Sequence, residues 1–343
     1  MFSPRSSTRV CGLSRRGDMT TGKMQPSRDV TAIGEGQLRL NTRLGTSLEV
    51  ANDLAVHVAG AEGNVLGLLS RLGNRTGLVT SLPTGSLGRR IAGEYRTAGV
   101  DTSAIVWRET GRVALYFVET STPPVPSRVT YDRADSCFAR LTRDDIDWDY
   151  LGDARLLHVT GITAALSEGL YACLTEAVAQ AHRHAQAVSV DVNYRSQLTT
   201  PERALKQLTP LLDGASIISC SRRDAATVFG LFGPVGDVAT ALSNRFGARW
   251  VLVSDGACDA AAYVDGTVLL AKPPATTVVD RVGAGDALIG GFLHGFLNED
   301  PEQGLRLGIA AAALALTRHD DQVRTTLPDL EALTRSFGQD IVR

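Results

Sequence analysis

The residues best suited to chemistry stand near the C-terminal end of the chain, where Gly283, Ala284 and Gly285 are followed by Asp286. An apolar stretch over 287–297 comes next, so these small residues should open a helix. The free N–H groups and the positive dipole end of a helix start bind anions. An acid beside such an anion hole can take a proton from a hydroxyl group while the hole stabilises a phosphoryl group. The pattern is therefore suited to phosphoryl transfer, in which Asp286 would act as the base.

A lone G-x-G-D pattern also has simpler interpretations. The glycines could form only a tight turn, and Asp286 could be only a favourable helix-start residue. The run is not a P-loop, because no G-K-[ST] follows. The turn over 34–36 lacks the third glycine of a dinucleotide-binding motif, and a β-like pattern follows where that motif needs a helix. None of the six histidines pairs with a serine or cysteine at a catalytic spacing.

Composition excludes several other classes of function. The 343 residues are 43% hydrophobic and carry a net charge of -2 without a basic stripe, so no nucleic-acid partner is expected. No apolar run approaches the roughly 20 residues that span a bilayer, so no membrane association is expected. The five cysteines are scattered and show no C-x-x-C spacing, which argues against zinc and disulfides. We expect a cytoplasmic protein.

The elements that must position the glycine turn alternate along the chain. Residues 1–29 lack hydrophobic periodicity and are expected to be a disordered extension, and order should begin with a strand over 30–34. We predict further strands over 77–80, 156–160, 188–192, 216–220 and 250–254. We predict helices over 64–72, 87–98, 168–183, 201–212, 222–229, 285–297, 301–317 and 328–337. This succession predicts an α/β fold with a mostly parallel central sheet and helices on both faces.

Two segments break the alternation. Residues 38–58 and 113–132 resemble β-ribbons without intervening helices, and such insertions commonly form a flap over the site of an α/β domain. No linker suggests a second independent domain, so we expect one domain over 30–338 with a small β-ribbon lid.

Two motifs resemble the ribokinase-like (PfkB) carbohydrate kinases. The closing signature of that family, D-[ST]-x-G-A-G-D, corresponds to DRVGAGD at 280–286, with Arg281 in the Ser/Thr position. The opening signature, G-G-x-x-x-N, corresponds to AGAEGN at 59–64, with Ala59 for the first glycine. The resemblance spans about residues 30–329. It implies a ribokinase-like three-layer sandwich, ATP and Mg²⁺ as cofactors with a monovalent cation as a further candidate, and a homodimer formed through the ribbons.

Several segments are similar to 2-keto-3-deoxygluconate kinases, namely residues 60–64, 115–117, 129–134, 158–163 and 191–195. The last segment ends in Arg195, whose guanidinium group can form a fork of two hydrogen bonds to a carboxylate. Arg195 and Arg133 are therefore the candidates for binding the acidic end of a sugar acid. The alternative for each of them is a structural salt bridge.

The resemblance assigns further positions to the sugar. Gly60 and Asn64 would contact sugar hydroxyls, although Asn64 could instead cap a helix. Tyr116 would cover the sugar from the second ribbon, and Tyr131 lies two residues before Arg133 on the same strand face. The alternative for both tyrosines is packing in the core.

The remaining site positions concern the nucleotide. The family motif N-x-x-E, which positions water around Mg²⁺, reads Ser221 to Asp224 here, so Asp224 would reach the metal through water. A Ser with an Asp three residues later is also a helix cap. The family turn K-x-G-x-x-G reads Ser254 to Asp259 and keeps only Gly256, which should let the backbone approach the phosphates together with Gly283 and Gly285. Asp259 should point outward, because it would repel phosphates.

We therefore predict an ATP-dependent kinase that phosphorylates a hydroxyl group of a sugar acid, with 2-keto-3-deoxygluconate as the first candidate. Two alternatives stay open. One is another carbohydrate kinase, such as a fructokinase-like enzyme, because Val118 stands where some keto-deoxygluconate kinases have an arginine. The other is a sugar-binding homologue that kept the fold without catalysis.

Overall fold

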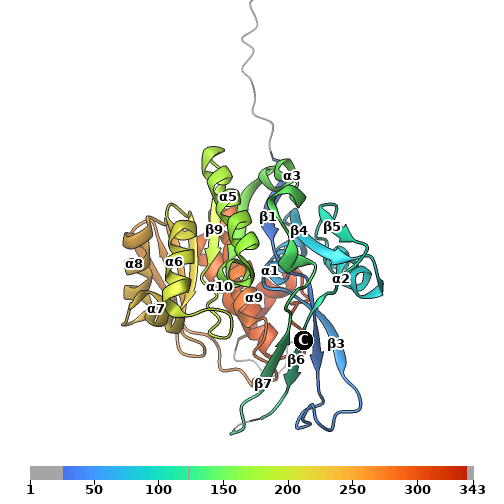
Figure 1. Cartoon of the computed structure of the whole chain (residues 1–343). Coiled ribbons are helices and arrows are strands. Elements are labelled where there is room, and N and C mark those ends of the chain that lie inside the picture. The colour runs from blue at the N-terminus through green and yellow to red at the C-terminus, as the bar shows by residue number, and fades with distance from the viewer. Residues whose placement is uncertain (1–25, 123, 338–343) are drawn as a thin grey trace, which may run out of the picture.

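A mostly parallel sheet organises the chain, and it runs through the middle of a computed structural model that describes residues 26–122 and 124–337 (Figure 1). Within these residues the sheet has nine strands in the order β13-β12-β11-β10-β9-β8-β1-β4-β5. The strands from β5 to β11 are parallel, whereas the pairs β11–β12 and β12–β13 are antiparallel. The bounds are β1 (Arg28–Ile33), β4 (Thr76–Pro83), β5 (Ile105–Arg108), β8 (Ala154–Thr160), β9 (Ala187–Asp191), β10 (Ile217–Ser221), β11 (Trp250–Ser254), β12 (Ala260–Val264) and β13 (Thr267–Ala271).

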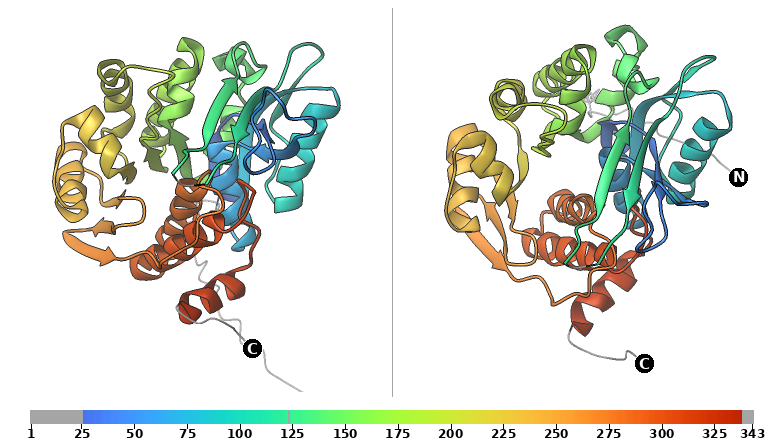
Figure 2. Two further views of the ribbon diagram at one scale, coloured as in Figure 1. Left: turned by 90° about the horizontal axis from the view of Figure 1, so that it is seen from below. Right: turned by 60° about the horizontal axis from the view of Figure 1, so that its bottom comes forward.

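Helices cover both faces of this sheet and complete three layers (Figure 2). One face packs against α3 (Trp148–Gly152), α4 (Gly161–Leu166), α5 (Glu168–Arg183), α6 (Pro201–Leu212), α7 (Arg222–Phe229), α8 (Val235–Phe246) and the short 3-10 helices over 138–140 and 143–145. The other face packs against α1 (Ala61–Arg71), α2 (Ser86–Ala98), α9 (Ala284–Leu297) and α10 (Pro301–Leu316), with α11 (Leu327–Ser336) outside α10.

Local sequence explains why these helices form and where they begin. In α5, the side chain of Ser167 accepts a hydrogen bond from the N–H of Leu170 and so caps the helix start. Its buried residues recur at spacings of three and four and form one apolar stripe, made of Leu170, Cys173, Leu174, Ala177, Val178 and Ala181. In α6, Thr200 is the cap and Pro201 occupies the first turn, where its missing N–H costs nothing.

A second, smaller sheet projects from one end of the central sheet, at the bottom of Figure 1. It consists of β2 (Gln37–Asn41), β3 (Ala55–Ala59), β6 (Ala114–Glu119) and β7 (Arg128–Asp132), in the order β3-β2-β6-β7. Its outer pairs are antiparallel, whereas β2 and β6 are parallel. We call these four strands the small sheet. The two segments expected as β-ribbons supply its strands, with irregular turns between them.

The expected α/β architecture with a mostly parallel sheet and a small accessory sheet is confirmed. Helix α1 begins at Ala61, three residues before the expected start, and β1 begins at Arg28, two residues before the expected start. Residues 1–25 of the expected extension lie outside the described residues, so that extension stays a prediction. None of the described helices is both long enough and apolar enough to cross a membrane.

Candidate active site

A cavity of about 420 Å³ opens where the carboxyl ends of the central strands meet the start of α9 and the small sheet. Crevices at the carboxyl ends of parallel strands are the usual ligand sites of open α/β sheets. Most of the residues predicted for the site line this cavity, namely Gly60, Asn64, Tyr116, Tyr131, Arg195, Ser221, Asp224, Ser254, Gly283, Gly285 and Asp286. Arg133, Gly256 and Ala284 do not line it.

The start of α9 has the geometry of an anion site. Gly283 precedes the helix with φ 85°, a conformation that favours glycine, and an added Cβ would lie 2.6 Å from the carbonyl oxygen of Asp321. Among the described residues, a Cβ at Gly285 would meet no atom within 4 Å beyond its chain neighbours and its own helix backbone, so open space lies beside it. The N–H groups that open a helix have no partner within it and can face an anion there. The N–H of Val282, just before this helix start, donates to Asp280 Oδ1 at 3.0 Å and is therefore already paired.

Asp286 lies in the first turn of α9, as predicted, and its side chain faces the cavity. Burial raises the pKa of Asp286 to about 7, against the lowering effects of its hydrogen bond from Asn64 and of the nearby Arg195. A carboxyl group with a pKa near neutrality is well matched to accept a proton at physiological pH.

Asn64 lies on α1, which packs against α9, and its side chain reaches Asp286. Its Nδ2 donates to Asp286 Oδ2 at 2.7 Å, while its buried Oδ1 has no partner among the described residues. The N-cap of the helix is Gly60, so the alternative role of Asn64 as a helix cap is wrong. Gly60 itself has φ 146°, and an added Cβ would lie 2.2 Å from the carbonyl oxygen of Glu35. Only glycine therefore fits at that turn.

A second carboxyl group, that of Asp191, faces the same cavity from the end of β9. Burial raises the pKa of Asp191 to about 8, and the nearby Asp286 adds to the rise while Arg195 opposes it. In the segment 191–195, only Arg195 was predicted to belong to the site. Because a strand end in a parallel sheet faces the crevice, the position of Asp191 directly after an apolar run was the signal that could have identified it.

The two candidate arginines differ in their surroundings. Arg195 is exposed at the cavity wall and also lines an adjoining cavity of about 420 Å³ that shares Tyr131 and Asp224 with the first. Arg133 is 8% exposed, and its Nε and Nη2 donate to Glu35 Oε2 at 3.1 and 2.5 Å. This pairing favours the structural salt bridge for Arg133 and leaves Arg195 as the arginine available to a ligand.

The two candidate tyrosines lie together on the small sheet, with ring centroids 5.8 Å apart. Tyr116 is 4% exposed and donates its hydroxyl to the carboxylate of Asp321. Tyr131 is only partly buried. Each tyrosine thus combines core packing with a face on the cavity.

Three residues predicted for the nucleotide line the cavity where β10, α7 and β11 meet it, namely Ser221, Asp224 and Ser254. Ser221 Oγ accepts from the N–H of Asp224 at 3.0 Å, so the helix cap that we considered is present. Asp224 is 5% exposed and still lines the cavity. Gly256 lies in an exposed turn, and Asp259 lines a separate pocket with Arg222 and Lys272.

Two further lining residues on the small-sheet side, Gln37 and Asp321, were not predicted. Gln37 is 7% exposed, and its Oε1 has no partner among the described residues. Neither residue belongs to a motif. Their nearness to Asp286 arises only from folding.

An acid beside an open helix start, at the carboxyl ends of a parallel sheet and under a small second sheet, defines a small-molecule kinase. Comparison with known proteins agrees, because residues 28–328 match the pfkB family of carbohydrate kinases. This chain therefore belongs to that family, and it is a transferase that phosphorylates an alcohol group.

Individual relatives cover almost the whole chain. It is 34% identical over 316 residues to a 2-dehydro-3-deoxygalactonokinase of Haloferax volcanii, covering 92% of this chain and 99% of the relative. A 2-dehydro-3-deoxygluconokinase of Thermoproteus tenax is 28% identical over 311 residues, covering 90% and 94%. The crystal structure of a 2-dehydro-3-deoxygluconokinase from Thermotoga maritima superposes with a TM-score of 0.85 at 29% identity, covering 90% of this chain and 98% of that one. The ribokinase-like fold expected from the sequence is thereby confirmed.

Proposed function

We propose that this kinase transfers the γ-phosphoryl group of ATP to a hydroxyl group of a six-carbon 2-keto-3-deoxy sugar acid. The observation that carries the proposal is the juxtaposition in one cavity of Asp286, the open start of α9 and the exposed Arg195. A base, an anion site and a cation suited to a carboxylate are the three groups that this reaction needs.

Each side chain then has a defined task. Asp286 accepts the proton of the attacking hydroxyl group, and the N–H groups of Gly283, Ala284 and Gly285 stabilise the transferred phosphoryl group. Arg195 binds the sugar carboxylate. Asn64, Gly60, Tyr116 and Tyr131 contact the rest of the sugar. The small sheet covers the sugar and keeps water from the phosphoryl group.

The polar side chains that line the cavity beside β10 and β11 are suited to ATP and Mg²⁺. Ser221 ends β10, Asp224 lies in the first turn of α7 and Ser254 ends β11, and all three line the same cavity as Gly285. Asp224, a carboxylate on this side of the cavity, would hold Mg²⁺ through water. When bound, Mg²⁺ neutralises the developing charge on the phosphates. Gly256 and Arg133 have no task in this arrangement.

We further propose that the protein works in the cytoplasm as a homodimer. Four described cysteines, Cys137, Cys173, Cys220 and Cys258, are free thiols, which suits a reducing compartment. The edge strands β3 and β7 of the small sheet are available for pairing between two subunits.

Two sugar acids that differ at one carbon are the first substrates to compare. The name of the Haloferax volcanii relative favours 2-keto-3-deoxygalactonate, and that of the Thermotoga maritima structure favours 2-keto-3-deoxygluconate. The test is a coupled ATP-consumption assay with both acids, fructose and ribose, with the product identified by mass spectrometry. We expect kcat/KM to be highest for one of the two acids. Higher activity on fructose would contradict the sugar-acid assignment, and activity on no sugar despite sugar binding would contradict the kinase assignment.

A further inference from the structure

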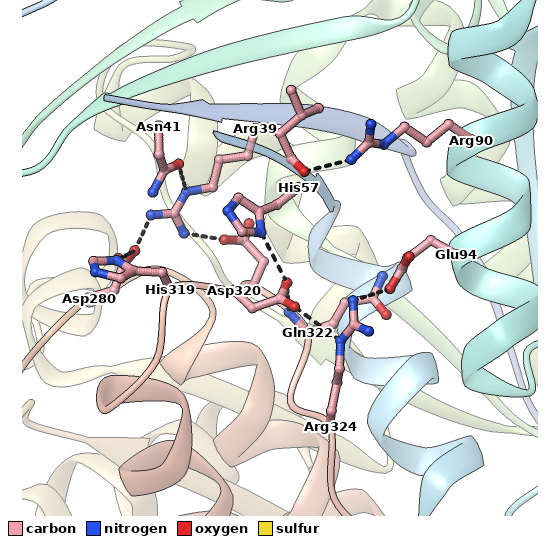
Figure 3. Close-up of polar contacts among 12 residues, drawn as sticks. Arg39, Asn41, His57, Arg90, Glu94, Asp280, His319, Asp320, Gln322 and Arg324 are labelled. Atoms are coloured by element: carbon pink, nitrogen blue, oxygen red, sulfur yellow. Dashed lines mark hydrogen bonds and ion pairs between the residues drawn. The ribbon is translucent and has the colours of Figure 1, made fainter. Parts of the chain in front are cut away.

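A fully buried arginine connects the small sheet to the turn that precedes the catalytic acid. Arg39 lies on β2 and is 0% exposed. Its Nε donates to Asn41 Oδ1 at 2.6 Å, Nη1 donates to Asp321, and Nη2 donates to Asp280 (Figure 3). Burial disfavours the charge on Arg39, yet the carboxylates of Asp321 and Asp280 outweigh that effect and raise its pKa. Arg39 is thus a permanently charged group between two acids.

Both acids contact the backbone that leads into α9. Asp280 begins the run 280–286, and its second oxygen accepts from the N–H of Val282 at 3.0 Å. Asp321 lies between α10 and α11, and its carbonyl oxygen lies so close to Gly283 that a Cβ there would be 2.6 Å away. The guanidinium group of Arg39 therefore holds the two sides of the turn that precedes Asp286.

The small sheet reaches this turn with two neighbouring side chains. Arg39 on β2 is directly opposite Tyr116 on β6, and Tyr116 donates its hydroxyl to the same carboxylate, that of Asp321. Asp321 also lines the cavity. One carboxylate thus accepts from two adjacent strands of the small sheet while its own backbone packs against Gly283.

The need for stability alone does not explain why a charged arginine and two carboxylates are buried here. Burying a charge and its partners costs free energy, and well-packed apolar residues often stabilise such a position as well. What a guanidinium group adds is geometry, because its planar fork can engage two carboxylates at fixed directions. An ammonium group has no such fork.

We infer that Arg39 is a positioning residue that couples the place of the small sheet over the sugar to the place of the turn before Asp286. Asp280, Asp321 and Tyr116 are the contacts through which it acts. The coupling belongs to the unliganded protein, whereas its effect on turnover rests on the proposed function. A displaced small sheet would displace the anion site and the base together.

The direct test is hydrogen–deuterium exchange of the full-length protein without ligands. We expect Arg39→Met to speed amide exchange in peptides covering residues 280–288 by roughly tenfold or more, as suits the loss of a buried charge pair. Arg90→Met is the control, because the Nη2 of Arg90 donates to the carbonyl oxygen of Val56 at 2.8 Å and so also connects the small sheet to the main body. Among the described residues, Arg90 forms no side-chain hydrogen bond to the turn over 280–286. The control should leave those peptides unchanged.

Kinetic measurements on the preferred substrate give a second readout. We expect Arg39→Lys and Asp321→Asn each to lower kcat by roughly tenfold or more while KM for ATP changes little, since the base and anion site lose their alignment. The double variant should lose little more than either single variant, because both changes disrupt one contact. If Arg39→Met does not fold, Arg39→Lys serves in the exchange experiment as well.

The outcomes separate the two proposals. If the folded Arg39 variant exchanges like the wild type over 280–288 and keeps the wild-type kcat, the coupling is wrong and the kinase assignment is untouched. If the wild type phosphorylates no sugar, the proposed function is wrong, and the exchange data alone decide about Arg39.

Discussion

At the scale of single residues, Asp286 depends on its neighbours for its usefulness as a base. Its pKa lies near 7 because burial disfavours its charge while the Asn64 amide and Arg195 favour it. An acid with an ordinary pKa would accept a proton less readily, and one with a much higher pKa would stay protonated at neutral pH. The site therefore balances opposing effects on one carboxyl group.

We predict that Asn64→Ala moves the acidic limb of the pH profile of kcat/KM to higher pH. Removing the donor that favours the charged carboxylate raises the pKa of Asp286 further, by roughly one to two units if a charged hydrogen bond is lost. The measurement is kcat/KM against pH for the wild type and for Asn64→Ala. Asn74→Ala, which removes a contact to His294 away from the cavity, is the control. An acidic limb that stays in place or moves down would contradict this role of Asn64.

Residue roles could be predicted from the sequence where they belong to motifs or to segments similar to those of known kinases. The glycine turn, Asp286 and Asn64 are parts of two signatures, so they could be placed at once. Arg39 and Asp321 are 282 positions apart and belong to no motif, so nothing local indicates that they meet. Arg133 had the right residue type for a carboxylate ligand, but folding placed Glu35 beside it.

At the scale of elements, the start of α9 carries the chemistry because two glycines there do different things. Gly283 is required by the conformation of the turn and by the close approach of Asp321. Gly285 leaves room in the cavity. The same residue type thus has one structural and one functional reason within a single helix start.

This difference gives a paired prediction. Gly283→Ala should lower the free energy of unfolding by about 1–2 kcal/mol or more, because alanine disfavours positive φ and its Cβ would collide with the backbone of Asp321. Gly285→Ala should keep wild-type stability but lower kcat/KM, because its Cβ would occupy space needed by the phosphoryl group. Chemical denaturation and steady-state kinetics on both variants provide the check. Equal losses of stability in the two variants would contradict the distinction.

Periodicity predicted most elements, and the exceptions have physical reasons. Helices α5, α6 and α7 have the predicted bounds because clear caps and apolar stripes mark them. Helix α8 and the hairpin of β12 and β13 were not predicted. The hairpin turns at Asp265 and Gly266, both with positive φ, so the Asp-Gly pair was a usable turn signal. The assembly of β2, β3, β6 and β7 into one sheet depends on contacts between distant segments.

At the scale of the whole molecule, the buried acids of the active site lower the stability of the folded protein. The folded protein gathers Asp286, Asp191 and Asp321 around one cavity, and burial raises the pKa of each. A group with a raised pKa in the folded state favours folding below its unfolded pKa, and this contribution is lost as the pH rises to the folded value. For Asp191, that window runs from its ordinary value of 3.8 to about 8.

We therefore predict that Asp191→Asn makes the unliganded protein more stable than the wild type at pH 8, and by much less at pH 4. Each pKa unit corresponds to about 1.4 kcal/mol, so the gain at pH 8 should reach a few kcal/mol. Thermal or denaturant unfolding across this pH range measures the difference. If the gain in stability of the variant over the wild type did not change with pH, the pKa of Asp191 would not be raised in the folded protein, and the prediction would be wrong.

The central claim is that Asp286 accepts the proton of the sugar hydroxyl group, and one comparison of variants tests it most directly. Asp286→Asn and the exposed control Asp259→Asn are assayed with ATP and the preferred sugar acid, and sugar binding is measured by calorimetry. We predict that Asp286→Asn lowers kcat by about 10² to 10⁴-fold while sugar binding and fold persist, and that Asp259→Asn behaves like the wild type. An Asp286→Asn enzyme within about tenfold of the wild-type kcat would contradict the account, because a general base cannot be removed at so small a loss.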